Sequence, residues 1–269
     1  MKPEAGHRRT YPRRVPGARP VEVIMNATTS TTLRPAYDVI VAGLGPAGAT
    51  LANLLALRGL SVLALDREAD IYRLPRAIHF DGECMRVFQT IGIADEMAPG
   101  LVVAPGMKFV DAAGRPLLDW PRPTHIGPQG WHHSYRFHQP NLEEALRQRL
   151  RQQPHVDIRL RHGVFALEQQ RDDMLVRMKD MPCGQLLHTR ARYVVGCDGA
   201  RSTVRRFMGT ALEDLGCHER WLGCGHLLCP HREASADRGG GAGLPAYVGF
   251  LRRGTRIHAC SVIHQRPDT

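Results

Sequence analysis

Three glycines, Gly43, Gly45 and Gly48, form the spacing G-x-G-x-x-G, which suits the binding of a phosphorylated cofactor. The first glycine permits a tight turn, the second lets the backbone approach a pyrophosphate, and the third lets a helix pack closely on strands. A helix beginning at Pro46 and Ala47 presents free N–H groups and the positive end of its dipole to phosphates. The spacing therefore predicts that the chain binds a dinucleotide.

The elements around these glycines make the signature specific. Residues 37–42 form an apolar, β-branched run typical of a buried parallel strand, and a helix follows from Pro46. A second buried strand, residues 61–65, ends at Asp66, whose carboxylate is placed to accept hydrogen bonds from an adenosine ribose, with Arg67 next to it. A bare G-x-G-x-x-G is weak and can be a structural turn, but the order strand, helix, strand, acid favours dinucleotide binding.

A second signature lies far downstream. The apolar strand predicted at residues 192–197 leads into residues 198–205, which read D-G-x-x-S-x-V-R. A carboxylate such as Asp198, at a strand end beside Gly199, can reach the ribose or pyrophosphate region of a cofactor, while Ser202 and the arginines anchor the turn that follows. An Asp-Gly pair alone is more often an ordinary turn. The eight-residue pattern resembles a hallmark of flavin hydroxylases and their relatives, and with the glycine signature this resemblance implies a flavin enzyme.

Residues 37–222 resemble the class A flavoprotein aromatic hydroxylases, which have the p-hydroxybenzoate hydroxylase fold, and within them the 3-(3-hydroxyphenyl)propionate hydroxylase branch. Arg76 matches a family arginine that lies along the flavin, although a surface salt bridge is the alternative. Gln139 matches a family glutamine that contacts the flavin. The residues expected to bind FAD are Gly43, Gly45, Pro46, Ala47, Gly48, Asp66, Arg67, Arg76, Gln139, Asp198 and Gly199.

The resemblance implies an FAD-dependent monooxygenase that takes electrons from NADH or NADPH and uses molecular oxygen to hydroxylate a small phenolic substrate. The cofactor carries the reactive centre, so the protein mainly positions, desolvates and polarises. Catalytic residues are not assigned. The candidates are His79, Asp81, Trp131 and His132. For each of them the alternative is a structural role as a hydrogen-bonded residue. A second hypothesis is a non-catalytic fragment of a flavin domain. A third, an NAD-dependent dehydrogenase, is disfavoured by the Asp198 motif.

The resemblance implies a doubly wound, Rossmann-like α/β domain that binds FAD and a discontinuous, strand-rich substrate domain that is incomplete at its C-terminus. We expect the FAD-binding domain to comprise residues 36–105 and 135–206, and the substrate domain to include residues 106–134 and 207–222. Residues 107–120 predict two strands around a glycine-containing turn. Asn141 and Glu144 have the spacing of a capping box and predict the start of a helix whose apolar face is Leu142, Ala145, Leu146 and Leu150.

Residues 223–269 depart from the family pattern. They contain the run Gly239–Gly241 and many arginines, and neither sheet strands nor a Gly-Asp-Ala-Ala-His segment is expected in them. Our hypothesis is a frameshift after about Leu222, in a GC-rich gene whose product uses few lysines. The test is to translate the other two reading frames of the DNA beyond codon 222. The hypothesis is rejected if neither frame encodes a Gly-Asp-Ala segment. Loss of half the substrate sheet would expose strand faces and edges, so low stability is expected.

Composition limits the remaining functions. Of the net charge of +10, residues 1–20 carry +5 and residues 223–269 carry +3, so the body has no basic stripe for nucleic acid. The longest apolar stretch, residues 39–65, is interrupted by glycine, proline, asparagine and arginine, so no membrane span is expected. Seven cysteines without regular spacing favour the cytoplasm. The ligand spacing in residues 224–231 is too tight for zinc, so no metal is expected.

The N-terminal residues 1–35 are basic, rich in proline and without hydrophobic periodicity, so we expect a disordered extension. Met25 is an alternative start of the chain. The identity of the substrate, the choice between NADH and NADPH, and the oligomeric state stay open on the sequence.

Overall fold

The structure is a computed structural model that describes residues 33–73, 76–110, 115–216, 220–226, 246–253 and 256–261, the last three as backbone only. Contacts divide the chain after Leu33, and the elements described below all belong to residues 34–269. Of the extension expected at residues 1–35, residues 1–32 lie outside the described residues.

A six-stranded sheet carries the first predicted strands. Its order is β8-β2-β1-β11-β10-β9, and the strands β8, β2, β1 and β11 run parallel. The bounds are β1 (Ala36–Ala42), β2 (Val62–Asp66), β8 (Val156–Leu160), β9 (His162–Gln169), β10 (Met174–Asp180) and β11 (Leu186–Gly196). Ile40 and Val41 in β1 are both fully buried although they face opposite sides of the sheet, so the sheet is covered on both faces at β1, as in α/β folds.

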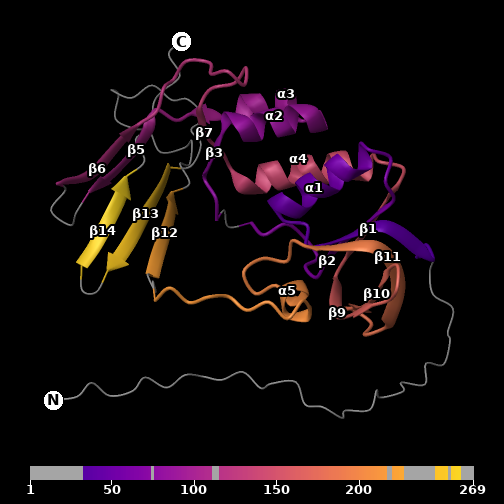
Figure 1. The fold of residues 1–269 in the computed structure, drawn as a ribbon. Coiled ribbons are helices and arrows are strands. Elements are labelled where there is room, and N and C mark those ends of the chain that lie inside the picture. Colours follow the sequence, from indigo (N-terminus) through magenta and orange to yellow (C-terminus); the bar gives the residue numbers. More distant parts are fainter. Residues whose placement is uncertain are drawn as a thin grey trace, which may run out of the picture. The chain divides into compact units, whose positions relative to one another are not determined.

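Of the described helices, three contact this sheet: α1 (Pro46–Ala56), α4 (Gln139–Arg151) and α5 (Thr203–Phe207). The others, α2 (Gly82–Ile91), the short α3 (Ala94–Met97) and the 3₁₀ turn η1 (Ala98–Gly100), form a further layer in which α2 packs on α1 and α3 on α4. In Figure 1 α1 and α4 lie side by side, and they are in contact. Leu44, Met85 and Leu146 are among the fully buried side chains of the shared core. Among the described residues, no helix is both long and apolar enough to cross a bilayer.

Helix α4 begins three residues earlier than the capping-box pattern predicts, since that pattern has Asn141 as the N-cap. Its N-cap is His138, without a side-chain cap, and Pro140 lies in its first turn, where the fixed φ of proline is already helical. The side chain of Asn141 therefore bonds to the ring of His138 instead, with Oδ1 2.9 Å from Nδ1. The apolar face is confirmed, since Leu142, Ala145, Leu146 and Leu150 are all buried.

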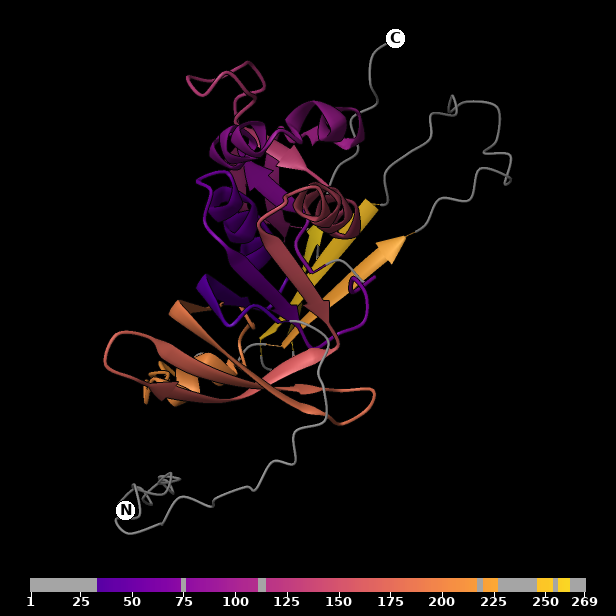
Figure 2. The same cartoon turned by 90° about the vertical axis from the view of Figure 1, so that its right-hand side faces the viewer.

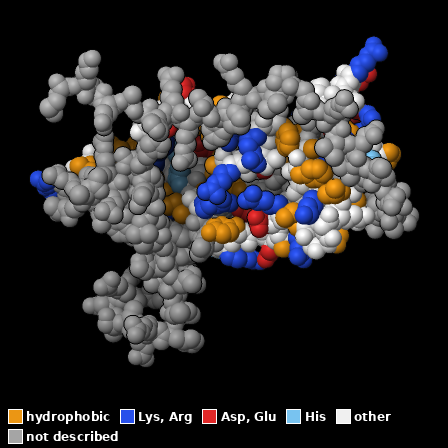
Figure 3. Space-filling view, turned by 90° about the horizontal axis from the view of Figure 1, so that it is seen from below, with side chains coloured by type: hydrophobic (Ala, Val, Ile, Leu, Met, Phe, Trp, Pro, Cys, Tyr) orange, Lys and Arg blue, Asp and Glu red, His pale blue; other side chains and the backbone are white. Residues whose placement is uncertain are grey.

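Strands β9 and β10 form antiparallel pairs beside β11, and sequence analysis missed both of them. Figure 2 shows these strands, coloured from salmon to orange, next to one another, and in the order of the sheet they form the end opposite to β8. β11 also begins earlier than the predicted residue 192, because its first half pairs only with β10. On the face shown in Figure 3, arginine and lysine side chains are interspersed with hydrophobic and acidic ones.

A small sheet of order β3-β7-β4 packs against the helices. It contains β3 (His79–Asp81), β4 (Val102–Val103) and β7 (Ser134–Arg136), all antiparallel. The ring of Phe80 lies 5.4 Å from that of Phe88 on α2 and 4.8 Å from that of Phe137 after β7. This aromatic cluster holds the small sheet on the core, so the side chains of β3 and β7 have fixed positions.

A five-stranded antiparallel sheet has the order β12-β13-β14-β5-β6. The strands β5 (Gly106–Val110) and β6 (Pro116–Pro121) are the two predicted around a turn. The others are β12 (Arg220–His226), β13 (Ala246–Arg253) and β14 (Arg256–Ser261). The expectation of no sheet strands after residue 222 was therefore wrong, because Tyr, Val and Phe in residues 246–250 favour a strand despite the neighbouring arginines.

The frameshift hypothesis stays a prediction, to be decided on the DNA. The cysteines and histidines of residues 224–231, for which no metal was expected, have side chains that lie outside the described residues.

Candidate functional site

The glycine loop, residues 43–48, joins β1 to α1, and two of its glycines are required by the packing of the protein itself. Gly43 has φ +100°, and a Cβ there would lie 2.4 Å from the carbonyl oxygen of Cys197. A Cβ on Gly48 would lie 1.8 Å from the carbonyl oxygen of Gly43. Both distances are far below van der Waals contact, so the loop can close only with glycine at these two positions.

Gly45 is different, because no protein atom requires it to be glycine. A Cβ built on it meets nothing within 4 Å, and its backbone is extended, with φ −68° and ψ −175°. It is the N-cap of α1, it makes no side-chain capping bond, and the first turn of α1 has no acidic residue. An open backbone approach at an uncapped helix N-terminus fits a phosphate group. Pro46 and the exposed Ala47 continue this open surface.

Asp66 lies at the end of β2 and is bonded to the glycine loop. Its Oδ2 accepts hydrogen bonds from Leu44 N (3.2 Å) and from Arg147 Nη2 (3.0 Å), and its Oδ1 accepts one from Glu68 N (3.0 Å). Arg147 Nη2 also donates to the carbonyl oxygen of Leu44 (3.1 Å). Arg67 instead is exposed and pairs with Glu68. The structure thus places Asp66 beside the loop, as the sequence predicts.

Sequence analysis did not single out Arg147. It lies 81 positions from Asp66 along the chain, on a helix whose arginines otherwise read as a solvated face. Its position among Leu142, Ala145, Leu146 and Leu150 on the apolar face was the available signal, because a charge on that face must have a buried partner.

Gln139 and Arg76 are brought together through the backbone. The buried Gln139 accepts hydrogen bonds at Oε1 from Arg76 N and Ala77 N, both 2.8 Å, and donates from Nε2 to Glu143 Oε1 at 2.7 Å. The guanidinium of Arg76 lies over the ring of Tyr72, 5.2 Å from its centroid. Gln139 therefore fixes the course of residues 76–77.

The two signatures meet at the ends of β1 and β11. Cys197 N donates to Ala42 O at 2.7 Å, and the carbonyl oxygen of Cys197 borders Gly43. Asp198, next in the chain, therefore lies beside the glycine loop, and Gly199 has φ +80° with open space around it. This matches the rule that ligands bind beyond the carboxyl ends of parallel strands.

The carboxylate of Asp198 also has a structural role at the N-terminus of α5. It accepts hydrogen bonds from Ser202 Oγ (2.5 Å) and Thr203 N (2.6 Å), while Ser202 Oγ accepts one from Arg205 N (3.0 Å). Ser202 thus anchors the segment that follows, as the motif predicts. A cofactor contact of Asp198 stays a prediction.

We expect Asp198→Ala to lower the free energy of unfolding by about 2–3 kcal/mol, because Ser202 and the first N–H groups of α5 lose an ionised acceptor. Asp198→Asn keeps one acceptor oxygen and should lose less. Urea unfolding followed by circular dichroism measures both. Asp173→Ala is the matched control, since it breaks an exposed ion pair with Arg190 and should cost under about 1 kcal/mol. Equal losses for Asp198→Ala and Asp173→Ala would contradict the capping role.

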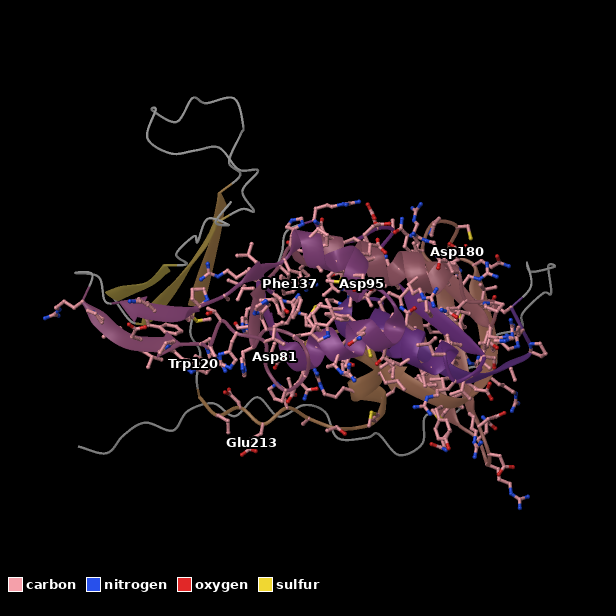
Figure 4. All side chains as sticks on the ribbon, turned by 90° about the horizontal axis from the view of Figure 1, so that it is seen from above. Asp81, Asp95, Trp120, Phe137, Asp180 and Glu213 are labelled. Atoms are coloured by element: carbon pink, nitrogen blue, oxygen red, sulfur yellow. The ribbon has the colours of Figure 1, made fainter. Side chains whose placement is uncertain are left out.

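The four catalytic candidates lie around the small sheet and the start of α2. His79 Nε2 is 2.6 Å from Ser134 Oγ on the neighbouring strand. Asp81 caps α2 by accepting a hydrogen bond from Cys84 N at 3.0 Å, and Figure 4 labels it together with Phe137. A Cβ on Gly82, at the start of α2, would lie 2.8 Å from the carbonyl oxygen of His132, so the segment of Trp131 and His132 runs against this helix start.

Each of these candidates makes a hydrogen bond that also has a structural explanation. Trp131 Nε1 donates to Gln89 Oε1 at 3.1 Å. His132 donates from its backbone N to the hydroxyl of Tyr135 at 2.8 Å, and its ring Nδ1 lies 2.6 Å from Thr124 O. The structure therefore gathers the candidates in one region, and their catalytic roles stay predictions.

His79 gives a test by pH. Burial of the imidazole lowers its pKa below the ordinary 6.5, the charges of Arg122 and Arg136 lower this pKa further, and Asp81 opposes them. The unfolded chain takes up the proton near pH 6.5 and the folded chain only at lower pH, so the free energy of unfolding should fall as pH decreases below about 6.5. Urea unfolding across this range should show a shallower slope for His79→Gln.

The control for this pH effect is His188→Gln, which removes an imidazole from an exposed position on β11. If the slope of stability against pH is the same in His79→Gln and in the parent chain, the burial of a neutral His79 is not its source.

Comparison with known proteins adds to this geometry. The family described as "FAD binding domain" matches residues 36–224. The chain belongs to this family. The FAD-binding domain thus includes the glycine loop, Asp66, Gln139 and the Asp198 motif. The predicted resemblance to flavoprotein hydroxylases, the fold class and FAD as cofactor are confirmed.

Two relatives have names that describe hydroxylases. A probable NADH-specific resorcinol 4-hydroxylase of Rhodococcus jostii (strain RHA1) is 44% identical over 198 residues, 72% of this chain and 37% of the relative. A 3-(3-hydroxy-phenyl)propionate/3-hydroxycinnamic acid hydroxylase of Mycobacterium sp. (strain JLS) is 34% identical over 239 residues, 86% of this chain and 40% of the relative. The chain thus matches well under half the length of these relatives.

Solved structures share the fold. p-Nitrophenol 4-monooxygenase PnpA from Pseudomonas putida DLL-E4 has a TM-score of 0.66 at 20% identity, covering 88% of this chain and 60% of that one. The flavin-dependent monooxygenase PieE, solved with FAD and substrate, has a TM-score of 0.62 at 23% identity, covering 87% of this chain and 44% of that one. At these identities the likeness concerns the fold.

Proposed function

We propose that this chain provides the FAD-binding domain and part of the substrate domain of a monooxygenase that hydroxylates a phenolic ring, using NADH and molecular oxygen. The observation that carries the proposal is the open Gly45 backbone at the uncapped start of α1, beside Asp66, in a chain of the FAD-binding family. The names of the Rhodococcus and Mycobacterium relatives support phenolic substrates, and the former supports NADH over NADPH.

The glycine loop and the ends of β2 and β11 are the proposed FAD site. The N–H groups of Gly45 and Ala47 face the pyrophosphate, Pro46 between them has no N–H and starts the helix, and Asp66 accepts hydrogen bonds from the ribose hydroxyls. Gly43 and Gly48 keep the loop closed. The remaining residues that we assign to FAD are Arg67, Arg76, Gln139, Asp198 and Gly199. When bound, FAD supplies the electron transfer and oxygen chemistry that amino-acid side chains lack.

The small sheet and its neighbours are the proposed substrate side of the FAD-binding domain. Burial lowers the pKa of His79, which favours the neutral imidazole, and its Nε2 makes a hydrogen bond with Ser134 Oγ at 2.6 Å. Asp81, Trp131 and His132 border the same strands and complete the candidate set. We keep the domain boundaries expected from the sequence. β5 and β6 belong to the substrate domain in this division, and the pairing of β5 with β14 rather than with the six-stranded sheet supports this.

We place the reaction in the cytoplasm, because Cys84, Cys183 and Cys197 are free thiols, and a reducing compartment keeps them so.

The purified chain tests the proposed function. It is expected to retain a yellow flavin after gel filtration and to oxidise NADH faster when resorcinol or 3-(3-hydroxyphenyl)propionate is added, with a hydroxylated product found by mass spectrometry. Flavin retention without stimulated NADH oxidation would support the non-catalytic fragment instead. A colourless chain that binds no added FAD would overturn the proposed function altogether.

A further inference from the structure

Arg147 is a buried arginine that contacts the glycine loop from outside it. Only 4% of the residue is exposed, and in its ion pair with Asp66 the two side chains are 5% and 12% exposed. Its Nη2 makes both bonds, to Asp66 Oδ2 at 3.0 Å and to Leu44 O at 3.1 Å. A charge of this kind is costly to bury, so its partners must be held in a defined geometry.

Leu44 lies between the two glycines of the tight turn, and both polar groups of its backbone are held. Its N–H donates to Asp66 Oδ2 and its carbonyl oxygen accepts from Arg147. One carboxylate and one guanidinium thus fix the orientation of the backbone at Leu44. The direction in which the following Gly45 N–H points depends on this orientation.

The same contacts fix the Asp66 side chain. Oδ2 is engaged by Leu44 N and Arg147, and Oδ1 accepts from Glu68 N. A carboxylate has about four lone-pair sites, so Oδ1 keeps room for one further donor such as a ribose hydroxyl. Without Arg147 the carboxylate would keep only its two backbone donors, Leu44 N and Glu68 N, and would lose the charged one.

We propose that Arg147 is a positioning residue for the ADP half of FAD, which sets the Leu44 backbone and the Asp66 carboxylate without touching the cofactor. This inference rests on the proposed function only through the FAD site, not through the hydroxylation. Arg147 acts from α4, whose other buried side chains are apolar apart from Gln139 and Glu143. Its Nε is buried and has no hydrogen-bond partner among the residues that the structure describes, so the contacts of the guanidinium with the glycine loop and Asp66 are those of Nη2.

The test compares two arginines of the same helix. Arg147→Lys keeps the positive charge, but a lysine side chain ends one atom short of Nη2 and cannot make both bonds. Arg149→Lys is the matched control, because Arg149 Nε donates to Ile91 O at 3.0 Å and ties α4 to α2, away from the glycine loop. Arg147→Met removes the charge as well, and its loss of stability is recorded separately by urea unfolding.

The measurement is the dissociation constant of each apoprotein for FAD, by flavin fluorescence, and for ADP, by calorimetry. Arg147→Lys is expected to raise the dissociation constants for FAD and for ADP by the same factor, roughly tenfold. The reason is that the lost contact positions residues that bind the ADP half, which both ligands share. Arg149→Lys is expected to change both constants less than about twofold at a similar loss of stability.

Three outcomes overturn the inference. They are unchanged binding in Arg147→Lys, a loss for FAD without a loss for ADP, and an equal loss in Arg149→Lys, which would show a general effect of helix stability. NADH oxidation by the parent chain is measured separately, so a chain that binds ADP and FAD as expected but oxidises no NADH rejects the proposed hydroxylation and leaves the role of Arg147 standing.

Discussion

Gly48→Ala is expected to prevent folding of the chain. The added Cβ would lie 1.8 Å from the carbonyl oxygen of Gly43 and 3.0 Å from Cys197 Cβ. The first of these atoms belongs to the backbone of Gly43, which is held by the bond from its N–H to Leu65 O at 2.7 Å and bordered by Cys197, so it has little room to move aside. We expect a loss of about 4 kcal/mol or more, which approaches the whole stability of an ordinary domain. Circular dichroism and urea unfolding measure it.

Gly45→Ala is the matched control, three residues earlier in the same loop. Its Cβ meets nothing within 4 Å and its backbone is extended, so the free energy of unfolding should change by less than about 1 kcal/mol. FAD binding, in contrast, should weaken at least roughly tenfold, because the methyl group occupies the space of the pyrophosphate. A Gly45→Ala chain that binds FAD like the parent would show that the phosphates lie elsewhere. A stable Gly48→Ala chain would show that Gly48 does not lie so close to the carbonyl oxygen of Gly43.

Gln139→Leu is the second substitution with a large expected effect. It removes the acceptor of two backbone N–H groups, at Arg76 and Ala77, and leaves the carboxylate of Glu143, only 2% exposed, without the donor 2.7 Å away. Uncompensated buried groups of this kind should cost about 3–5 kcal/mol. Unfolding in urea gives the stability, and limited proteolysis near residues 73–77 reports whether that segment has come loose.

The control separates the two halves of this network. Glu143→Gln keeps an acceptor for Gln139 Nε2 and removes a buried charge, so it should be neutral or stabilising. The double variant Gln139→Leu/Glu143→Leu should lose less than the sum of the two single leucine variants, because the buried carboxylate is gone. Strict additivity in this cycle would show that the two side chains do not depend on one another.

Local patterns in the sequence predicted the parts of the site that lie within one unit of chain. The glycine spacing, the strand on either side of it and the acid at Asp66 are close in sequence, and each has a separate physical reason. The apolar face of α4 was equally readable, because the period of 3.6 residues places Leu142, Leu146 and Leu150 on one side. The start of α4 was not, since the proline in its first turn prevailed over the capping pattern.

Contacts between distant segments were not predictable in the same way. The bonds from Arg147 to Asp66 and Leu44 depend on how α4 packs across α1, which no local spacing encodes. The same is true of the dual role of Asp198, whose carboxylate caps α5 as well as bordering the glycine loop. Strands β9 and β10 went unnoticed because their alternation is interrupted, and the pairing with β11 that stabilises them is again long in range.

The position of β1 between β2 and β11 has a consequence for synthesis of the chain on the ribosome. One neighbour of β1 follows after a single helix, whereas the other is made only when Gly196 has been added. Loop closure over such a span slows folding, since its entropy must be lost before the pairing rewards it. We therefore expect the nascent β1–α1–β2 unit to keep β2 unpaired on one side until β8 has been made and β1 unpaired on the other side until Gly196 has been added, so that both strand edges are open to wrong pairing in the meantime.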